Sequence, residues 1–161
     1  MKTRCYVVLA IICTCVLAES RPAFAQKLYP VKGPLAQQTP QPVFSGHIRR
    51  PVFSSAPLFL LLKSWTVANG EVLEGKPKKM KATSANTQAP SPGSIDLPEP
   101  NLAWAWDAVY GDGYFVARIL GKEFGQGVFR GSKGTVLQVE SDDGRNGVAV
   151  DNKGNVYKMV W

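Results

Sequence analysis

Hydrophobic and polar residues alternate most clearly in the last third of the chain, over residues 102–161. Within Thr135–Glu140, for example, Leu137 and Val139 share one face of an extended chain and Gln138 lies on the other. Turns rich in Gly, Asp and Asn separate such runs at intervals of about ten residues, which is typical of all-β domains. The pattern predicts an all-β domain over 102–161, with about six short antiparallel strands in a small barrel or sandwich of SH3-like size.

A dense apolar run precedes that domain, within residues 58–74. Leu58–Leu62 is apolar throughout, and Asn69-Gly70 separates it from a second apolar pair at residues 72–73. Asn-Gly between apolar segments favours a hairpin because both residues accept positive φ. We therefore predict an apolar hairpin over 58–74, and a short buried helix over 57–66 is the alternative, since a brief apolar run suits both.

The apolar hairpin offers a way to stabilise the β-domain. A unit of about 60 residues buries little apolar surface and is only marginally stable alone. Exported domains of that size usually gain stability from disulfides, yet residues 26–161 contain no cysteine. We expect the hairpin to pack on the β-domain and extend its core, with a homo-oligomer as the alternative.

Two segments lack a core pattern and are expected to be linkers. Residues 26–57 hold six prolines, which disfavour helices and remove backbone donors, so we predict a disordered Pro-rich leader. Residues 75–101 are rich in lysine and then in Ser, Thr, Asn and Pro, which indicates a basic, Pro-rich linker. Two Pro-Val-Phe-Ser tetrads at 42–45 and 51–54 interrupt the leader, either by chance or as docking motifs.

Residues 1–25 have the three-part layout of a secretory signal peptide. Lys2 and Arg4 give a basic start, Tyr6–Ala18 is apolar, and Ala23 and Ala25 occupy the positions that a signal peptidase reads. The apolar stretch is shorter than the roughly 20 residues that span a membrane. We therefore predict cleavage near Ala25, no transmembrane anchor, and a periplasmic or secreted protein. All three cysteines are lost with the signal: Cys5, Cys13 and Cys15.

The charge of the chain favours anionic partners. The formal net charge is +7, of which residues 1–25 hold +2, so residues 26–161 carry +5. A mild positive charge promotes contact with anionic surfaces without requiring nucleic acid, and export argues against a nucleic-acid partner. The main basic cluster is expected to contact an anionic surface weakly, and it consists of Lys76, Lys78, Lys79 and Lys81.

Residues for catalysis or metal binding are scarce. His47 is the single histidine and lies in the proline-rich leader, without the rigid scaffold that a catalytic base needs. A mature chain without cysteine offers no thiol chemistry and hardly any zinc ligands. Asp142 and Asp151 begin loops that match a calcium loop only in part, and hairpin turns explain them better. We predict no enzyme, metal or cofactor, with a small secreted hydrolase that uses paired carboxylates as the alternative.

Aromatic side chains give the best lead for a binding site. Trp and Tyr combine a large contact area with a polar tip, which suits the walls of a glycan or peptide groove. The same residues also form the cores of small domains, and the sequence leaves both readings open. The predicted binding residues are Trp65, Trp104, Trp106, Tyr110 and Tyr114.

The segment Gly147–Tyr157 resembles the hairpin of an NHL-type propeller repeat. A propeller needs several blades and the chain holds one copy, so the resemblance implies a hairpin around Asp151–Gly154 and no function. Tyr157, Met159 and Trp161 alternate toward a terminal aromatic residue, which is similar to the C-terminal signal of outer-membrane barrels. Such barrels need more and longer strands than this chain offers, so we expect a buried final strand.

These patterns together indicate an exported, non-enzymatic β-module that binds a protein partner or a component of the cell envelope. Accessory, inhibitor and immunity proteins have this form, although that comparison rests on their class alone. A structural subunit of an envelope assembly, docked through the leader, is a further alternative.

Overall fold

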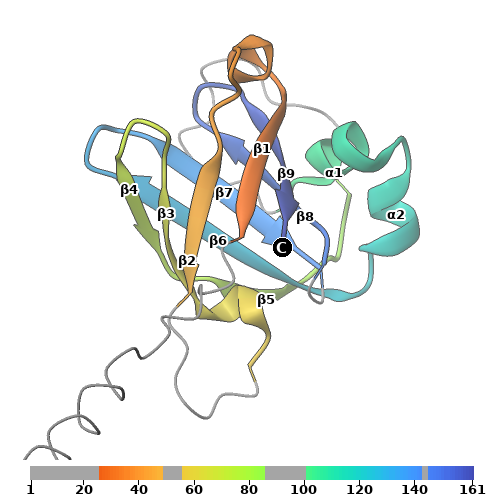
Figure 1. The fold of residues 1–161 in the computed structure, drawn as a ribbon. Helices are drawn as coiled ribbons and strands as arrows, with labels where there is room; N and C mark the ends of the chain where they lie inside the picture. Colours follow the sequence, from red (N-terminus) through yellow and green to blue (C-terminus); the bar gives the residue numbers. More distant parts are fainter. Residues whose placement is uncertain (1–25, 49–55, 86–100, 143–144) are drawn as a thin grey trace, which may run out of the picture.

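The computed structural model describes residues 26–48, 56–85, 101–142 and 145–161, so the predicted signal peptide lies outside it. The chain winds into an antiparallel β-barrel with two short helices on its outer surface (Figure 1). The strands are β1 (Lys27–Lys32), β2 (Phe44–Ile48), β3 (Leu62–Thr66), β4 (Val72–Gly75), β5 (Lys78–Lys81), β6 (Glu123–Gly131), β7 (Val136–Ser141), β8 (Gly147–Asp151) and β9 (Val156–Val160). The helical segments are η1 (Pro34–Gln37), η2 (Leu58–Leu61), α1 (Ala103–Tyr110) and α2 (Tyr114–Arg118).

Eight of the nine strands close the barrel, and every pairing is antiparallel. Strands β1 to β4 follow one another around the wall, β4 pairs with β6, and β6 to β9 lead back to β1. The barrel closes where β1 pairs with β9, with Lys27 opposite Val160. The additional strand, β5, pairs with β6. The predicted small antiparallel β-architecture is confirmed, whereas the predicted number of about six strands is wrong.

The prediction of a disordered leader is wrong for residues 27–48, which supply two strands of the barrel wall. Leu28 and Phe44 from these strands are buried in the barrel interior. The prolines occupy positions that tolerate them: Pro30 lies beside a bulge in β1, and Pro34 begins η1. Phe44 of the first Pro-Val-Phe-Ser tetrad is therefore a core residue, while the second tetrad lies outside the described residues.

Residues 58–75 contain the hairpin β3–β4 as part of the barrel wall, not as an addition to it. Its turn contains Gly70 at a φ of 80°, and Asn69 Oδ1 accepts a hydrogen bond of 2.9 Å from the Glu71 N–H. The preceding Leu58–Leu61 forms η2, so a helical turn and a strand follow one another where the sequence left the choice open. The predicted linker over 75–101 is wrong at Lys78–Lys81, which form β5.

Residues 103–118 include the helices α1 and α2, which corrects the prediction that residues 102–161 are all-β. The helix α1 begins where Glu140 of β7 accepts a hydrogen bond of 2.9 Å from the Leu102 N–H. Leu102 and Glu140 are far apart in the sequence. The local pattern of aromatic residues therefore gives no indication that a helix begins here. Trp104 and Trp106 consequently lie on different faces: Trp106 is fully buried and Trp104 is only partly buried.

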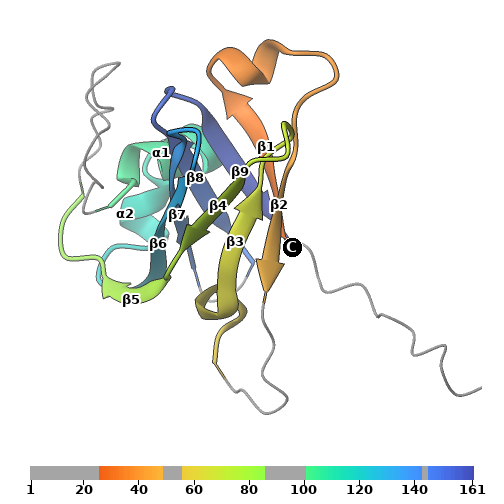
Figure 2. The same ribbon diagram turned by 90° about the vertical axis from the view of Figure 1, so that its left-hand side faces the viewer.

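Two apolar clusters hold the fold together. The first packs inside the barrel and includes Trp65, whose ring meets Phe129 edge-on at 6.3 Å between centroids. The second lies outside the barrel wall, where α1 and α2 cover β8 and the neighbouring strands, as Figures 1 and 2 show. It includes Trp106, Phe115, Val148 and Val150. The second cluster is what positions the helices, and they in turn form one wall of the candidate site.

Turn residues tie separate hairpins of the barrel together. Glu71, at the β3–β4 turn, accepts hydrogen bonds of 2.8 Å from the Lys133 N–H and from the Thr135 hydroxyl of the β6–β7 turn. Burial raises the pKa of Glu71, but these hydrogen bonds outweigh it and the pKa is lowered overall. At the β8–β9 turn, Asn155 Oδ1 accepts a hydrogen bond of 2.8 Å from the Leu35 N–H of η1.

Candidate binding groove

An open groove of about 530 Å³ lies between α2 and residues 142, 145 and 146, which connect β7 to β8. Its lining combines three exposed cationic side chains with a tyrosine, an isoleucine and two carboxylates. The lining residues are Tyr114, Arg118, Ile119, Lys122, Glu123, Asp142, Arg145 and Asn146. Such concave sites with a few converging polar groups are where ligands usually bind.

The helix α2 presents one wall of the groove because its other face is anchored. Phe115 and Ile119 are buried against the barrel, with exposed fractions of 0% and 3%. The Asp107 carboxylate of α1 accepts a hydrogen bond of 2.9 Å from the Phe115 N–H, which satisfies a donor of the first turn. Tyr114 and Arg118, one helical turn apart, are thereby held at the groove.

Asp142, Arg145 and Asn146, from the connection between β7 and β8, line the opposite wall, and Asp142 joins them. Its Oδ1 accepts hydrogen bonds from the backbone N–H groups of Arg145 (3.3 Å) and Asn146 (2.9 Å). Its Oδ2 accepts one of 2.8 Å from the Asn146 side-chain amide. Asp151 and Asn155 repeat this arrangement in the next turn. Both aspartates thus stabilise hairpin turns, and the described residues contain no group of three metal-ligating side chains that could hold an ion.

The groove is electropositive at its exposed rim. Arg118, Lys122 and Arg145 are exposed, while Asp142 already receives three hydrogen bonds from its own turn. Glu123, the other carboxylate, forms an exposed ion pair of 3.2 Å with Lys79, which contributes little to stability. The cationic side chains are therefore the groups that remain available to an incoming anion.

Tyr114 supplies a neutral phenol among these charges. Burial raises the pKa of Tyr114, the nearby Asp142 carboxylate raises it further, and Arg118 opposes the rise. The hydroxyl is consequently protonated at neutral pH, where it donates as well as accepts hydrogen bonds.

Three of the five aromatic residues predicted to bind a ligand stack together, and one of them, Tyr114, lines the groove. Trp106, Tyr110 and Tyr114 stack on one another, with centroid separations of 5.6 Å, 5.8 Å and 4.8 Å. The Tyr110 hydroxyl accepts a hydrogen bond of 3.2 Å from the Gly147 N–H, and Lys158 Nζ lies 5.3 Å from the centre of its ring. Among the three, Tyr114 lines the groove and the other two support it from behind.

The structure separates the other two predicted aromatic residues from the groove. Trp65 packs in the barrel interior, where its exposed fraction is 0%. Trp104, on α1, is partly buried against the outer cluster and is not among the lining residues of the groove. Sequence reasoning missed the cationic residues of the groove, because Arg118, Lys122 and Arg145 come from three separate segments.

A buried carboxylate, that of Glu140, holds the Trp106 ring of the aromatic stack in place. Glu140 accepts hydrogen bonds from the Trp106 Nε1–H (2.9 Å), the Gln126 side chain (3.0 Å) and the Leu102 N–H (2.9 Å). Burial raises the pKa of Glu140 to about 7, against the opposing effect of these three hydrogen bonds. Glu140 thus joins α1 to the barrel wall and fixes the position of the indole on which the tyrosines stack.

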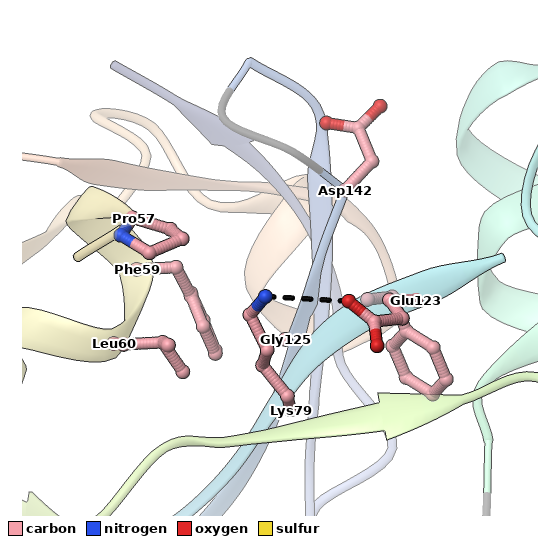
Figure 3. Close-up of a pocket in the computed structure, with 8 residues that line it drawn as sticks. Pro57, Phe59, Leu60, Lys79, Glu123, Gly125 and Asp142 are labelled. Carbon is pink, nitrogen blue, oxygen red and sulfur yellow. Dashed lines mark hydrogen bonds and ion pairs between the residues drawn. The ribbon is translucent and has the colours of Figure 1, made fainter. Parts of the chain in front are cut away.

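A small notch adjoins the groove and shares two of its residues. Figure 3 shows Phe59 and Leu60 of η2 on one side of this notch and the Lys79–Glu123 ion pair on the other. Its volume of about 20 Å³ holds no more than a water molecule or a methyl group. Gly125 forms its floor, where a Cβ atom would collide with the Phe59 ring. The shared residues, Glu123 and Asp142, make the notch an extension of the groove.

The predicted basic cluster and the single histidine lie elsewhere. Lys78, Lys79 and Lys81 belong to β5, and Lys79 alone among them reaches the notch. His47 lies on β2, where its Nε2 is 2.8 Å from the Thr66 hydroxyl.

Comparison with protein-family models, with curated proteins and with solved structures finds no match for this chain. Within the part of the chain that the structure describes, no helix has the length and apolar character needed to cross a membrane.

Proposed function

We propose that the protein is an exported, non-enzymatic binding module that holds a protein partner or a component of the cell envelope. The groove beside α2 is the proposed binding site, and an anionic group is the part of the ligand that it recognises. The observation that carries this proposal is the convergence of three exposed cations around a neutral tyrosine in one open groove.

The chemistry of the lining favours binding of an anion. Arginine side chains pair with carboxylate or phosphate groups through two parallel hydrogen bonds, and Arg118 and Arg145 lie on opposite walls of the groove. The Tyr114 hydroxyl, on the same helix as Arg118, adds a neutral donor to the lining. The cations of the groove are exposed and hydrated in the free protein. Binding of an anion therefore avoids the energetic cost of keeping an unpaired charge buried.

The arrangement of the carboxylates supports binding over catalysis. Glu71, Glu140 and Asp151 are buried, and each accepts hydrogen bonds that hold turns or helices in place. Asp142 accepts bonds from its own turn, and Glu123 pairs with Lys79. A glycosidase needs one carboxyl group free to protonate a leaving group and another free to activate water. These five carboxylates instead have structural partners.

Charge reversal in the groove provides the test. We expect R118E/R145E to weaken binding of residues 26–161 by at least about tenfold, as loss of two charge-assisted contacts implies. Immobilised poly-glutamate and lipopolysaccharide serve as probes for an acidic protein and an envelope component. The control is K27E/K32E, which makes the same change in net charge on β1, outside the groove.

Two outcomes would contradict the proposal. An equal loss of binding in both double variants would mean that net charge alone governs binding. Failure of both probes to bind the unmodified protein would remove the basis for an anion-binding groove.

A further inference from the structure

The strand β5 differs from the other strands in having one open edge. Each of the eight barrel strands has a neighbour on both sides, whereas β5 pairs along one side with Glu123–Gln126 of β6. The next part of the same edge of β6, Phe129–Gly131, pairs with β4. Figure 2 shows β5 at the lower margin of the barrel, beyond β6. The described residues place no strand along the other side of β5.

The register identifies which backbone groups face the open side. The Ala82 N–H donates to the Lys122 carbonyl oxygen (3.0 Å), in line with the pairing of Met80 with Phe124. In an antiparallel pair, backbone groups point toward the partner and away from it at alternate residues. The N–H and C=O groups of Lys79 and Lys81 therefore point away from β6, and among the described residues they have no backbone partner.

The open edge is strongly basic. Lys78, Lys79 and Lys81 belong to the strand and are exposed, and Lys76 precedes it. Within the described residues, the one ion pair that counters these charges joins Lys79 to Glu123. Lysines on an edge strand repel a second copy of the same edge and so prevent self-association. The same charges attract a strand of opposite charge, so the lysines both prevent self-association and favour an acidic partner.

We propose that β5 is the docking edge for an extended acidic segment of a protein partner, which adds to the sheet as a further strand. The segment exchanges backbone hydrogen bonds with Lys79 and Lys81, the mode known as β-strand addition. These two lysines lie on one face of β5, since side chains alternate along a strand. The partner segment therefore carries acidic residues two positions apart, opposite Lys79 and Lys81.

This inference rests on the proposed function and makes it more specific. Glu123 pairs with Lys79 of the edge and also lines the groove, so the two surfaces meet at one side chain. An acidic strand on β5 is therefore placed to direct a further carboxylate toward the cations of the groove. The preferred ligand becomes an acidic peptide segment rather than a component of the envelope.

The test uses residues 26–161 and a synthetic fluorescent peptide that alternates Glu with Val and Thr. The matched variants are Lys81→Pro and Lys81→Ala, which remove the same charge. Proline is tolerated at the open side of an edge strand, because the missing N–H takes part in no existing pairing. We expect Lys81→Pro to bind the peptide at least about fivefold more weakly than Lys81→Ala, as expected for one lost hydrogen bond.

A second measurement is independent of how the variants fold. The unmodified protein is titrated with the same peptide N-methylated at alternate residues, which blocks backbone donors on one edge of the peptide. In parallel, hydrogen exchange of the Lys79 and Lys81 amides is followed with and without the parent peptide. We expect the methylated peptide to lose binding, and both amides to become protected when the parent peptide is bound.

The outcomes separate this inference from the proposed function. Equal binding of the methylated and parent peptides would overturn strand addition, as would protection of both amides in the free protein. Binding lost in R118E/R145E but equal in the two Lys81 variants would support the groove and overturn the role of β5. Binding lost in Lys81→Pro but unaffected by R118E/R145E would support β5 and contradict the groove.

Discussion

At the scale of single residues, Glu140 has the greatest influence on the candidate site. Its carboxylate accepts hydrogen bonds from Leu102 at the start of α1, from Trp106 within α1, and from Gln126 of β6. Burial raises its pKa to about 7. The group therefore changes charge near neutral pH, in the contact that positions the aromatic stack behind Tyr114.

This pKa predicts a specific dependence of stability on pH. The folded protein holds the Glu140 proton more tightly than the unfolded chain, whose ordinary value is 4.5. The contribution is fully present below pH 4.5 and is lost as the pH rises to about 7, a change on the order of 3 kcal/mol. In Glu140→Gln, we expect the free energy of unfolding not to show this decrease between pH 4.5 and pH 7. Urea unfolding at both pH values measures it.

A matched variant and an opposing residue make the measurement specific. Glu123→Gln makes the same chemical change at an exposed carboxylate and serves as the matched control. Glu71 acts in the opposite direction, because its lowered pKa contributes stability above pH 4.5 that is lost at more acidic pH. The same pH dependence in Glu140→Gln and in the unmodified protein would show that Glu140 does not carry this effect.

The sequence identifies candidate residues by type but not by position in the fold. It marks Trp65 and Tyr114 equally, because both are aromatic, yet one packs inside the barrel and the other lines the groove. Arg118 and Arg145 escape notice because they lie on different elements and meet only in three dimensions. The spacing of Tyr114 and Arg118 becomes informative only when their segment is read as a helix.

At the scale of secondary-structure elements, α2 is the part of the groove that depends on a cap supplied by the preceding helix. The helix has five residues, which is too short to be stable without tertiary contacts. Its first-turn donor at Phe115 bonds to Asp107 of α1. The two helices are therefore coupled, and the groove wall depends on both.

Removal of this cap should loosen the groove wall selectively. We expect Asp107→Ala to destabilise α2 by about 1 kcal/mol, the usual cost of a lost cap. Hydrogen exchange of the Ala117 and Ile119 amides should then be faster, and poly-glutamate binding should weaken. Asp112→Ala, an exposed carboxylate in the loop between the helices, is the control. Unchanged exchange in Asp107→Ala would contradict a role for this cap.

Elements defined by local chemistry could be predicted, and those defined by distant contacts could not. Asn69-Gly70 and Asp151–Gly154 form hairpin turns because their own side chains and φ angles stabilise them. The helix α1 depends on Glu140, a residue on another element. The alternating pattern over 102–161 favoured strands throughout, since a sequence pattern does not contain that contact.

At the scale of the whole molecule, the barrel needs residues from both halves of the chain. Strands β1 to β4 form one half of the wall, and β6 to β9 form the other. Two pairings join the halves: β1 with β9, and β4 with β6. The prediction placed about six strands within 102–161, whereas four lie there, because part of that segment is helical; the other four barrel strands come from residues 27–75.

This division predicts that neither half is stable alone. A fragment of residues 102–161 retains β6 to β9 and both helices but leaves two unpaired sheet edges and exposes the inner cluster. We expect it to show no cooperative thermal transition by circular dichroism, whereas residues 26–161 unfold in one step. A cooperative transition of the fragment near that of residues 26–161 would refute this expectation.

The pairing of Lys27 with Val160 also constrains the order of events in folding. Contacts between residues so far apart in sequence form slowly, because a long loop must be ordered before they contribute any stability. The barrel wall cannot close until β9 is in place, so β1 and β8 each keep one unpaired edge until that late contact forms. Unpaired edges of this kind are templates for pairing with another chain, so we expect the partly folded protein to be most prone to aggregation before β1 meets β9.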